Sequence, residues 1–85
     1  MAETSSGIVE LVRGIVETLV DDVDAVEVTS TFTNDGCELV EIRVAADDAG
    51  KVIGRQGRVI KSIRVLARAA ACGNGNAVEV ELVEG

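Results

Sequence analysis

Apolar residues recur along this chain with two different periods, and the order of the periods limits the folds that it can adopt. From Ile8 to Val20 they recur at the three- and four-residue spacing of a helix that buries one side. Residues 25–32 and 38–45 instead alternate between apolar and polar, which predicts two strands with one polar face each. Between these strands, Thr33-Asn34-Asp35-Gly36 has the residues favoured in a tight hairpin turn.

The rest of the chain predicts two more helices and a third strand. A short helix is expected from about Asp48 to Ile53, with Asp47 as its N-cap and Gly54 as its end. A longer helix is expected from Arg58 to Ala71, ended by Gly73 in the left-handed C′ position. Residues 77–83 alternate again and predict the last strand.

The order α-β-β-α-α-β predicts an α+β fold, a two-layer sandwich. Each strand has one polar face, so we expect a three-stranded sheet with three helices on one face. The helical crossover from Ala45 to Ala77 favours at least one parallel pair of strands, while the strand order stays open. The 85 residues fit one domain, which we expect over residues 7–85. Residues 1–6 are expected to be a flexible N-terminus, with Ser5 or Ser6 as helix N-cap.

Composition argues against an enzyme. Histidine is absent, and the two cysteines, Cys37 and Cys72, are far apart in the sequence. The chain therefore lacks the commonest general base, the commonest metal ligand and any CxxC motif. The acidic cluster at residues 21–24 lacks the glycine and distal glutamate of a calcium loop, and neither phosphate-binding nor dinucleotide-binding glycine patterns occur. We expect no catalysis, no metal and no cofactor.

The sequence also contains no segment that predicts membrane insertion or secretion. No apolar run approaches the ~18 residues of a membrane-spanning helix, and residues 1–6 carry no basic region. We therefore expect no membrane partner and a cytoplasmic location.

The basic residues are concentrated in one stretch of an acidic chain. The net charge is −7, yet residues 49–78 contain six basic residues and no acidic one. That stretch carries +6, which leaves −13 for the rest of the chain. A solvated helix face is the ordinary explanation of a run of charges, but such faces usually mix both signs. The segregation favours a local site for an anion.

The segment from Gly50 to Ile63 indicates what that site could bind. Gly54 and Gly57 bracket two residues between the two predicted helices, and Gly57 leaves bare main chain just before the second helix. The N-terminus of a helix attracts anions through its unpaired N–H groups and its dipole. On the helix itself, an apolar arc of Val59, Ile63, Leu66 and Ala70, with Ile60 and Ala67 beside it, is expected in the core. The opposite side carries the cations Arg58, Lys61, Arg64 and Arg68.

These residues resemble the signature of the KH domain: an apolar pair, G-x-x-G, and spaced apolar and basic residues on the next helix. Here they are Val52-Ile53, Gly54-Arg55-Gln56-Gly57, Ile60-Lys61 and Ile63. With its extra helix and strand on the N-terminal side, the element order resembles the type II arrangement. The resemblance covers essentially the whole chain and is most specific over residues 47–72. In length the chain resembles the free-standing KH domains of small bacterial RNA-binding proteins.

The resemblance implies that the chain recognises single-stranded RNA, with the glycine loop clamping the backbone of about four nucleotides. By that resemblance Gly54 and Gly57 permit close approach, and Arg55 and Gln56 contact phosphate or ribose. The remaining implied site residues flank the backbone or form an apolar floor beneath the bases. The flanking residues are Lys51, Arg58, Lys61 and Arg64, and the floor residues are Val52 and Ile53, with Val44 and Arg43 as weaker candidates. The single aromatic residue, Phe32, alternates with core residues, so aromatic base stacking is not expected.

Three functions remain open. The first is a non-catalytic RNA-binding protein, such as an RNA chaperone or post-transcriptional regulator. The second is a KH-fold protein-interaction module that acts in ribosome or ribonucleoprotein assembly, and the third and least favoured is a small enzyme. The expected partners are single-stranded RNA and a second KH-domain protein, or a second copy of this chain, because pairing raises the avidity of a weak domain.

Overall fold

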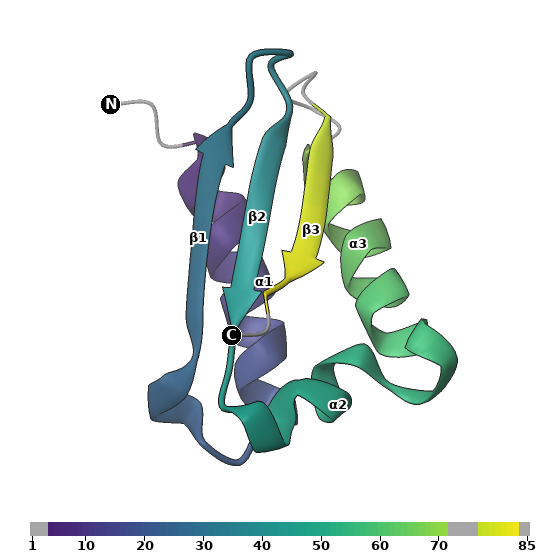
Figure 1. Ribbon diagram of the computed structural model, residues 1–85. Helices are drawn as coiled ribbons and strands as arrows, with labels where there is room; N and C mark the ends of the chain where they lie inside the picture. The colour runs from purple at the N-terminus through teal and green to yellow at the C-terminus, as the bar shows by residue number, and fades with distance from the viewer. Residues whose placement is uncertain (1–3, 72–76, 84–85) are drawn as a thin grey trace.

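The computed structural model describes residues 4–71 and 77–83, and their elements follow the predicted order (Figure 1). The helices and strands are α1 (Thr4–Leu19), β1 (Glu27–Phe32), β2 (Glu38–Arg43), α2 (Ala49–Ile53), α3 (Arg58–Ala71) and β3 (Val78–Leu82). In Figure 1, α1 lies behind β1 and β2, α3 lies beside β3, and α2 lies near the lower end of the strands. The expected α+β fold, with helices on one face of a three-stranded sheet, is confirmed.

The sheet has the strand order β1-β2-β3, with one antiparallel and one parallel pair. Strands β1 and β2 are antiparallel, and β2 and β3 are parallel. The predicted hairpin turn is present: the Thr33 N–H donates to the Cys37 carbonyl at 2.8 Å, and Gly36 has a φ of 84°. The parallel pair β2–β3 confirms the expectation drawn from the helical crossover. The strand order places β1 and β3 at opposite edges of the sheet.

The core lies between one face of the sheet and the two long helices. Strand residues that alternate in sequence turn their side chains toward the helices, since successive side chains of a strand point to opposite faces. Helix α1 contributes residues four apart, which form one stripe along its length. The buried apolar residues are Ile8, Val12, Val16, Val20, Val28, Val40, Ile42, Val52, Ile60, Ile63, Ala67, Ala71, Val78 and Val80.

Two predicted helix boundaries differ from the structure. Helix α1 begins at Thr4, so Ser5 and Ser6 lie inside it and neither is its N-cap. Asp47 is not the N-cap of α2 either, because residues 46–48 form a 3₁₀ turn and α2 begins at Ala49. Gly73, the predicted end of α3, lies outside the described residues.

Three side chains that were predicted to face the core are exposed. The buried face of α3 consists of Ile60, Ile63, Ala67 and Ala71. Leu66 (49% exposed) and Ala70 lie outside this face of the helix and are at the surface. Phe32, at the end of β1, is 51% exposed because β1 is an edge strand with no neighbouring strand on its other side among the described residues.

A buried carboxylate joins the end of α1 to the start of α2. Asp48 is 2% exposed, and its two oxygens accept the N–H groups of Asp21 and Asp22 at 3.2 and 3.0 Å. The ammonium group of Lys51 donates to Asp48 at 3.0 Å and to Asp21 at 2.6 Å. These bonds stabilise the charged form of Asp48, the one to the Asp22 N–H most strongly, and hold its pKa below the usual value. The Asp21 carboxylate, and then Asp48, raise the pKa of Lys51.

Gly54 allows α3 to start directly against the end of α2. Its φ is 78°, and its N–H donates to the Gly50 carbonyl at 2.8 Å to close the last turn of α2. A Cβ atom at this position would meet the Cγ2 atom of Val59 and lie 2.9 Å from the Val59 backbone nitrogen. Gly54 is therefore required both for its backbone conformation and for the space that it leaves.

Replacing Gly54 with alanine is expected to lower the free energy of unfolding by about 2–4 kcal/mol, because the methyl group meets backbone that cannot move freely. The midpoint of urea denaturation measures the loss. The control is Gly50→Ala inside α2, where a Cβ atom has nothing within 4 Å and alanine favours the helix. Equal midpoints for the two variants would contradict the assigned role of Gly54.

Asp48 is expected to stabilise the fold in a pH-dependent way. Its folded pKa is lower than its unfolded pKa, so its contribution is complete above about pH 4 and is lost as the pH falls through the folded value. Asp48→Asn removes this contribution. The urea midpoint of the variant should lie below that of the wild type at pH 7, and the gap should narrow toward about pH 2. A gap that stays constant over this range would show that the carboxylate charge has no such role.

Candidate nucleic-acid interface

The residues between α2 and α3 form a single 3₁₀ turn, Arg55–Gly57, and not an extended linker. The Gly57 N–H donates to the Gly54 carbonyl at 3.2 Å, which closes the turn. Gln56 has left-handed backbone angles (φ 59°, ψ 25°) and is the only non-glycine residue with a positive φ in the described part of the chain. A side chain in this conformation costs on the order of 1 kcal/mol, which the surrounding structure has to offset.

The turn exposes main chain at the N-terminus of α3. Arg55 and Gln56 are exposed, and Gly57 is half-buried with a φ of 75°. A Cβ atom on Gly57 would meet only the Cε atom of Lys61, at 3.9 Å, so open space lies beside the backbone here. An anion can therefore reach the N–H groups of the first turn of α3 without meeting a side chain.

Three cations around this turn carry no acidic partner in the described structure. Arg55, Arg58 and Lys61 are exposed, and the salt bridges found among residues 7–71 and 77–83 involve only Arg13 and Lys51. The Arg58 guanidinium lies 3.5 Å from the Gln56 side-chain oxygen, at the limit of a hydrogen bond. The charge at this corner is therefore available to an anion.

Two of the predicted cations are engaged by the protein itself. Lys51 is held between Asp21 and Asp48, so its charge is largely neutralised. Arg64 is half-buried, and its Nε donates to the Val80 carbonyl at 3.0 Å. That carbonyl points away from β2, because the Glu38 N–H bonds the Ala77 carbonyl and the direction alternates along a parallel strand. Arg64 therefore lies at the free edge of β3.

The predicted apolar floor is reduced to one residue near the turn. Val52 has no exposed surface, because it packs into the core from the inner side of α2, and it cannot contact a ligand. Ile53 is half-buried and remains partly accessible. Val44 packs against the core, and Arg43 is exposed on the outer face of the sheet, opposite Glu27 on β1.

Two features near this interface were not predicted from the sequence. Asp48 has a role in holding α2, and the signal for it was the Asp48–Lys51 spacing of three residues beside an unmatched acidic cluster at residues 21–24. The second feature is an exposed pair of aliphatic side chains on α3, Val65 and Leu66. Apolar residues occur around most of the circumference of this helix, more than one buried face needs.

The described residues do not form a metal site, and they contain no membrane-spanning helix. No three histidine, cysteine, aspartate or glutamate side chains in this part of the chain are grouped so that they could hold a metal ion. None of its helices combines the length and hydrophobicity that crossing a membrane requires. The chemistry available at the turn is therefore that of main-chain N–H groups, cations and a partly exposed aliphatic side chain.

Known proteins similar to this chain carry the name of an RNA-binding protein. RNA-binding protein KhpA of Caldanaerobacter subterraneus subsp. tengcongensis is 45% identical over 74 residues, which are 87% of this chain and 97% of that protein. The protein of the same name from Clostridium acetobutylicum is 42% identical over the same coverage. That of Borreliella burgdorferi is 36% identical over 76 residues, 89% of this chain and 92% of that protein. No solved structure gives a significant match.

A family model that matches most of this chain agrees with the glycine turn and the element order of the structure. The model of the family described as "KhpA/KhpB, KH domain" matches residues 9–82, which include both helices around the turn and all three strands. This match confirms the resemblance to the KH domain, and the names of the relatives agree with the prediction that the chain is not an enzyme. The chain belongs to the KhpA/KhpB KH-domain family.

Proposed function

We propose that this chain is a non-catalytic RNA-binding protein that holds single-stranded RNA by its backbone at the turn between α2 and α3. The observation that carries the proposal is the bare, accessible main chain at Gly57, between the unpaired cations Arg55 and Arg58. The names of the relatives support RNA as the anion. The acidic charge of the rest of the chain leaves few other places where a polyanion can approach.

In this proposal the backbone of the RNA lies across the turn and along the first two turns of α3. Gly54 and Gly57 give room for close approach, and Arg55 and Gln56 contact phosphate or ribose. Arg58 and Lys61 flank the same strand, and Ile53 offers an aliphatic contact to a base. Two residues act indirectly or at a distance from the turn, namely Lys51, which holds α2 through Asp48, and Arg64 at the edge of β3.

The chemistry of this surface favours weak and unselective binding. The only aromatic residue, Phe32, lies on β1, the strand at the opposite edge of the sheet from α3, so bases have no aromatic side chain on which to stack. Contacts to phosphate carry no sequence information. A domain over residues 7–85 with these properties would act on many cytoplasmic transcripts, as an RNA chaperone or post-transcriptional regulator does.

The double variant Arg55→Asp/Gln56→Asp is expected to keep its fold, because both side chains are exposed, and to lose at least about tenfold in affinity for RNA. Fluorescence anisotropy with a labelled oligouridylate at low salt measures the affinity. For the wild type, the logarithm of the affinity should fall with the logarithm of salt concentration with a slope of about −0.7 for each phosphate contact.

The control for this experiment is Thr31→Asp/Arg43→Asp, which changes the net charge by the same amount on the outer face of the sheet. This variant should bind RNA nearly as well as the wild type. If both double variants lose affinity equally, the overall charge governs binding, and the turn between α2 and α3 is not the RNA site.

A groove on α3 favours the second function, a protein-interaction module. Its volume is about 410 Å³, and its lining residues are Lys61, Ser62, Val65 and Leu66. These residues form two parallel ridges of residues four apart, and the groove between such ridges accepts a ridge of another helix. Val65 and Leu66 are 61% and 49% exposed, so they gain from being covered. We propose that α3 of a second copy of this chain packs here.

Leu66→Asp is expected to abolish this self-association without unfolding the chain, because the side chain lies at the surface. Sedimentation velocity from about 0.1 to 1 mM, where a pair with a Kd near 0.1 mM is populated, measures the oligomeric state. The matched change Leu11→Asp on α1, where leucine is 37% exposed, should leave association intact. A wild-type chain that stays monomeric over this range contradicts a homodimer, and a second KH-domain protein would then be tested on the same variants.

A further inference from the structure

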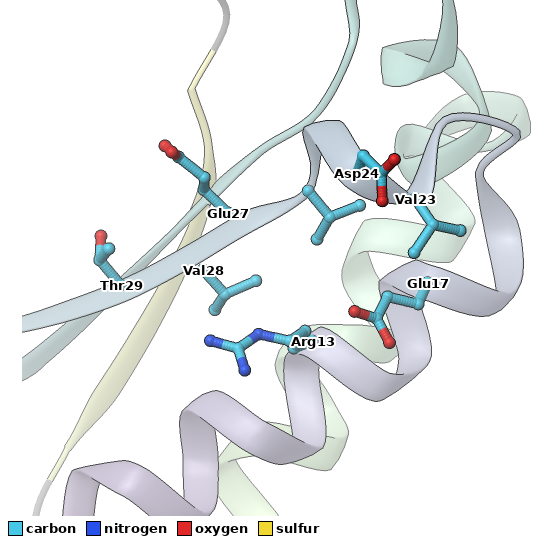
Figure 2. Close-up of a pocket in the computed structure, with 8 residues that line it drawn as sticks. Arg13, Glu17, Val23, Asp24, Glu27, Val28 and Thr29 are labelled. Atoms are coloured by element: carbon cyan, nitrogen blue, oxygen red, sulfur yellow. The ribbon is translucent and has the colours of Figure 1, made fainter.

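A second hollow lies on the other side of the molecule, between α1 and the edge strand β1 (Figure 2). Its volume is about 560 Å³. Its lining residues come from α1, from the 3₁₀ turn at residues 23–25, from residue 26 and from β1; they are Arg13, Glu17, Val23, Asp24, Val26, Glu27, Val28 and Thr29. The proposed RNA interface uses none of these residues.

The hollow runs along the free edge of β1 itself. Figure 2 shows Glu27 and Thr29 pointing to one side of the strand and Val28 pointing to the other side, toward α1. Residues from both faces of one strand can line a single hollow only where it passes the edge of the sheet. Among the described residues, no strand pairs with β1 on this side.

The hydrogen-bonding groups of this edge can be identified from the hairpin. The Thr33 N–H donates to the Cys37 carbonyl, so this pair is hydrogen-bonded across the β1–β2 ladder. Because the pairs alternate in an antiparallel ladder, Thr31 and Thr29 also bond to β2. The N–H and carbonyl groups of Val28, Ser30 and Phe32 therefore point outward, away from the sheet.

Strand β1 lacks three of the features that prevent an edge from pairing, namely lysine, proline and a bulge. Its sequence, Glu-Val-Thr-Ser-Thr-Phe, contains no lysine and no proline. Its pairing with β2 runs from Glu27 to Phe32 without a bulge, so the edge is regular over six residues. Natural sheets blunt exposed edges with lysine, proline or bulges. This edge can accept another strand.

The charges around the edge specify the kind of strand that fits. Three carboxylates, those of Glu17, Asp24 and Glu27, line the hollow. The one cation that lines the hollow, Arg13, is already paired, because its guanidinium Nη1 lies 3.3 Å from the Glu10 Oε2 atom. Val23 is 45% exposed and offers an apolar contact beside these carboxylates.

We propose that β1 is a docking edge for an extended basic segment of another protein, which adds to the sheet as a fourth strand. The segment bonds to the outward main-chain groups of Val28, Ser30 and Phe32. The side chains on the face of the segment that is turned toward α1 place the charged ends of lysine or arginine near Glu17 and Asp24 and their aliphatic stems near Val23. A second copy of this chain fits poorly, because each copy would bring the same acidic residues to the shared edge.

This surface is separate from the proposed RNA interface. Strands β1 and β3 are the two opposite edges of the sheet, and α3 packs beside β3 in Figure 1. A strand added to β1 therefore leaves the turn between α2 and α3 free. Binding at the two places can be measured independently, and the proposal about β1 does not depend on RNA binding.

The test uses two capped peptides, one of alternating lysine and valine and one of alternating glutamate and valine, each six residues long. We expect the lysine peptide to bind at least about tenfold more tightly than the glutamate peptide. In ¹H–¹⁵N spectra it should shift the amides of Val28, Ser30 and Phe32 and slow their hydrogen exchange. The amides of Arg55 to Arg58 should not move.

Two variants and one modified peptide separate strand addition from simple charge attraction. Ser30→Pro removes an outward N–H and keeps the ladder to β2, so it should weaken binding, while Ser30→Ala should not. The double variant Glu17→Gln/Asp24→Asn should lower the affinity for the lysine peptide and leave that for the glutamate peptide no lower. The lysine peptide with alternate N-methylated amides, which cannot pair with a strand, should not bind, and this comparison holds even if Ser30→Pro fails to fold.

The proposal is overturned if the N-methylated lysine peptide binds as well as the unmodified one, since attraction would then need no strand. It is also overturned if the three outward amides do not respond to any peptide. If, without any peptide, hydrogen exchange of the same amides slows as the protein concentration rises, the edge pairs with a second copy of this chain, which contradicts the proposal.

Discussion

The contact of Gly54 with Val59 is the constraint on which the rest of the candidate site depends. It lets α3 begin one turn after α2 ends, and a single added carbon would push the two helices apart. The separation would move the N-terminus of α3 away from the turn that exposes Gly57. The strained backbone of Gln56 belongs to the same arrangement, because a turn this short leaves no residue to absorb the change of direction. Strain at the turn is offset by the packing of both helices on the core.

The charges of this chain are arranged to repel a polyanion from most of its surface. On the outer face of the sheet, Glu41 lies directly opposite Glu81 in the parallel pair. Like charges that face each other across strands cost stability, so this pair does not hold the sheet together. Its effect is to make the open face of the sheet unfavourable for RNA. By contrast, the turn that starts at Arg55 and the whole of α3 contain no acidic residue.

Local patterns predicted the elements of this fold well, because the spacing of apolar residues within each short segment determines whether it forms a helix or a strand. Alternation and helical spacing gave three strands and three helices, and the end of α2 at Gly54 follows from one residue type. Contacts between distant residues were not predictable in this way. Asp48 bonds main-chain groups that lie 26 and 27 residues away in sequence, and no local spacing reports such a pairing.

The errors in the candidate site have the same physical origin. An apolar residue beside a glycine loop fits equally well beneath a ligand or inside the core, and only packing decides that Val52 is buried. On α3, apolar residues outnumber those that one face can bury, so the sequence alone could not say that Leu66 would be exposed. From the sequence, the charge of Lys51 was expected to be free to bind RNA. One of its two acidic partners, Asp21, is 30 residues away in sequence, and the other, Asp48, lies in the 3₁₀ turn before α2.

The separation of three surfaces on so small a domain explains how weak contacts can be useful. The edge of β1 shares no residue with the turn before α3 or with the groove on α3, so a strand bound there leaves both free, whereas the turn and the groove meet at Lys61. A single KH domain with no aromatic side chain at its proposed RNA interface gains little from each nucleotide. Joining it to a second domain turns the next contact with the same RNA into an intramolecular event, at an effective concentration in the millimolar range for short spacings. Affinity can then rise by orders of magnitude without any new contact at the turn, which can stay open enough to release the RNA.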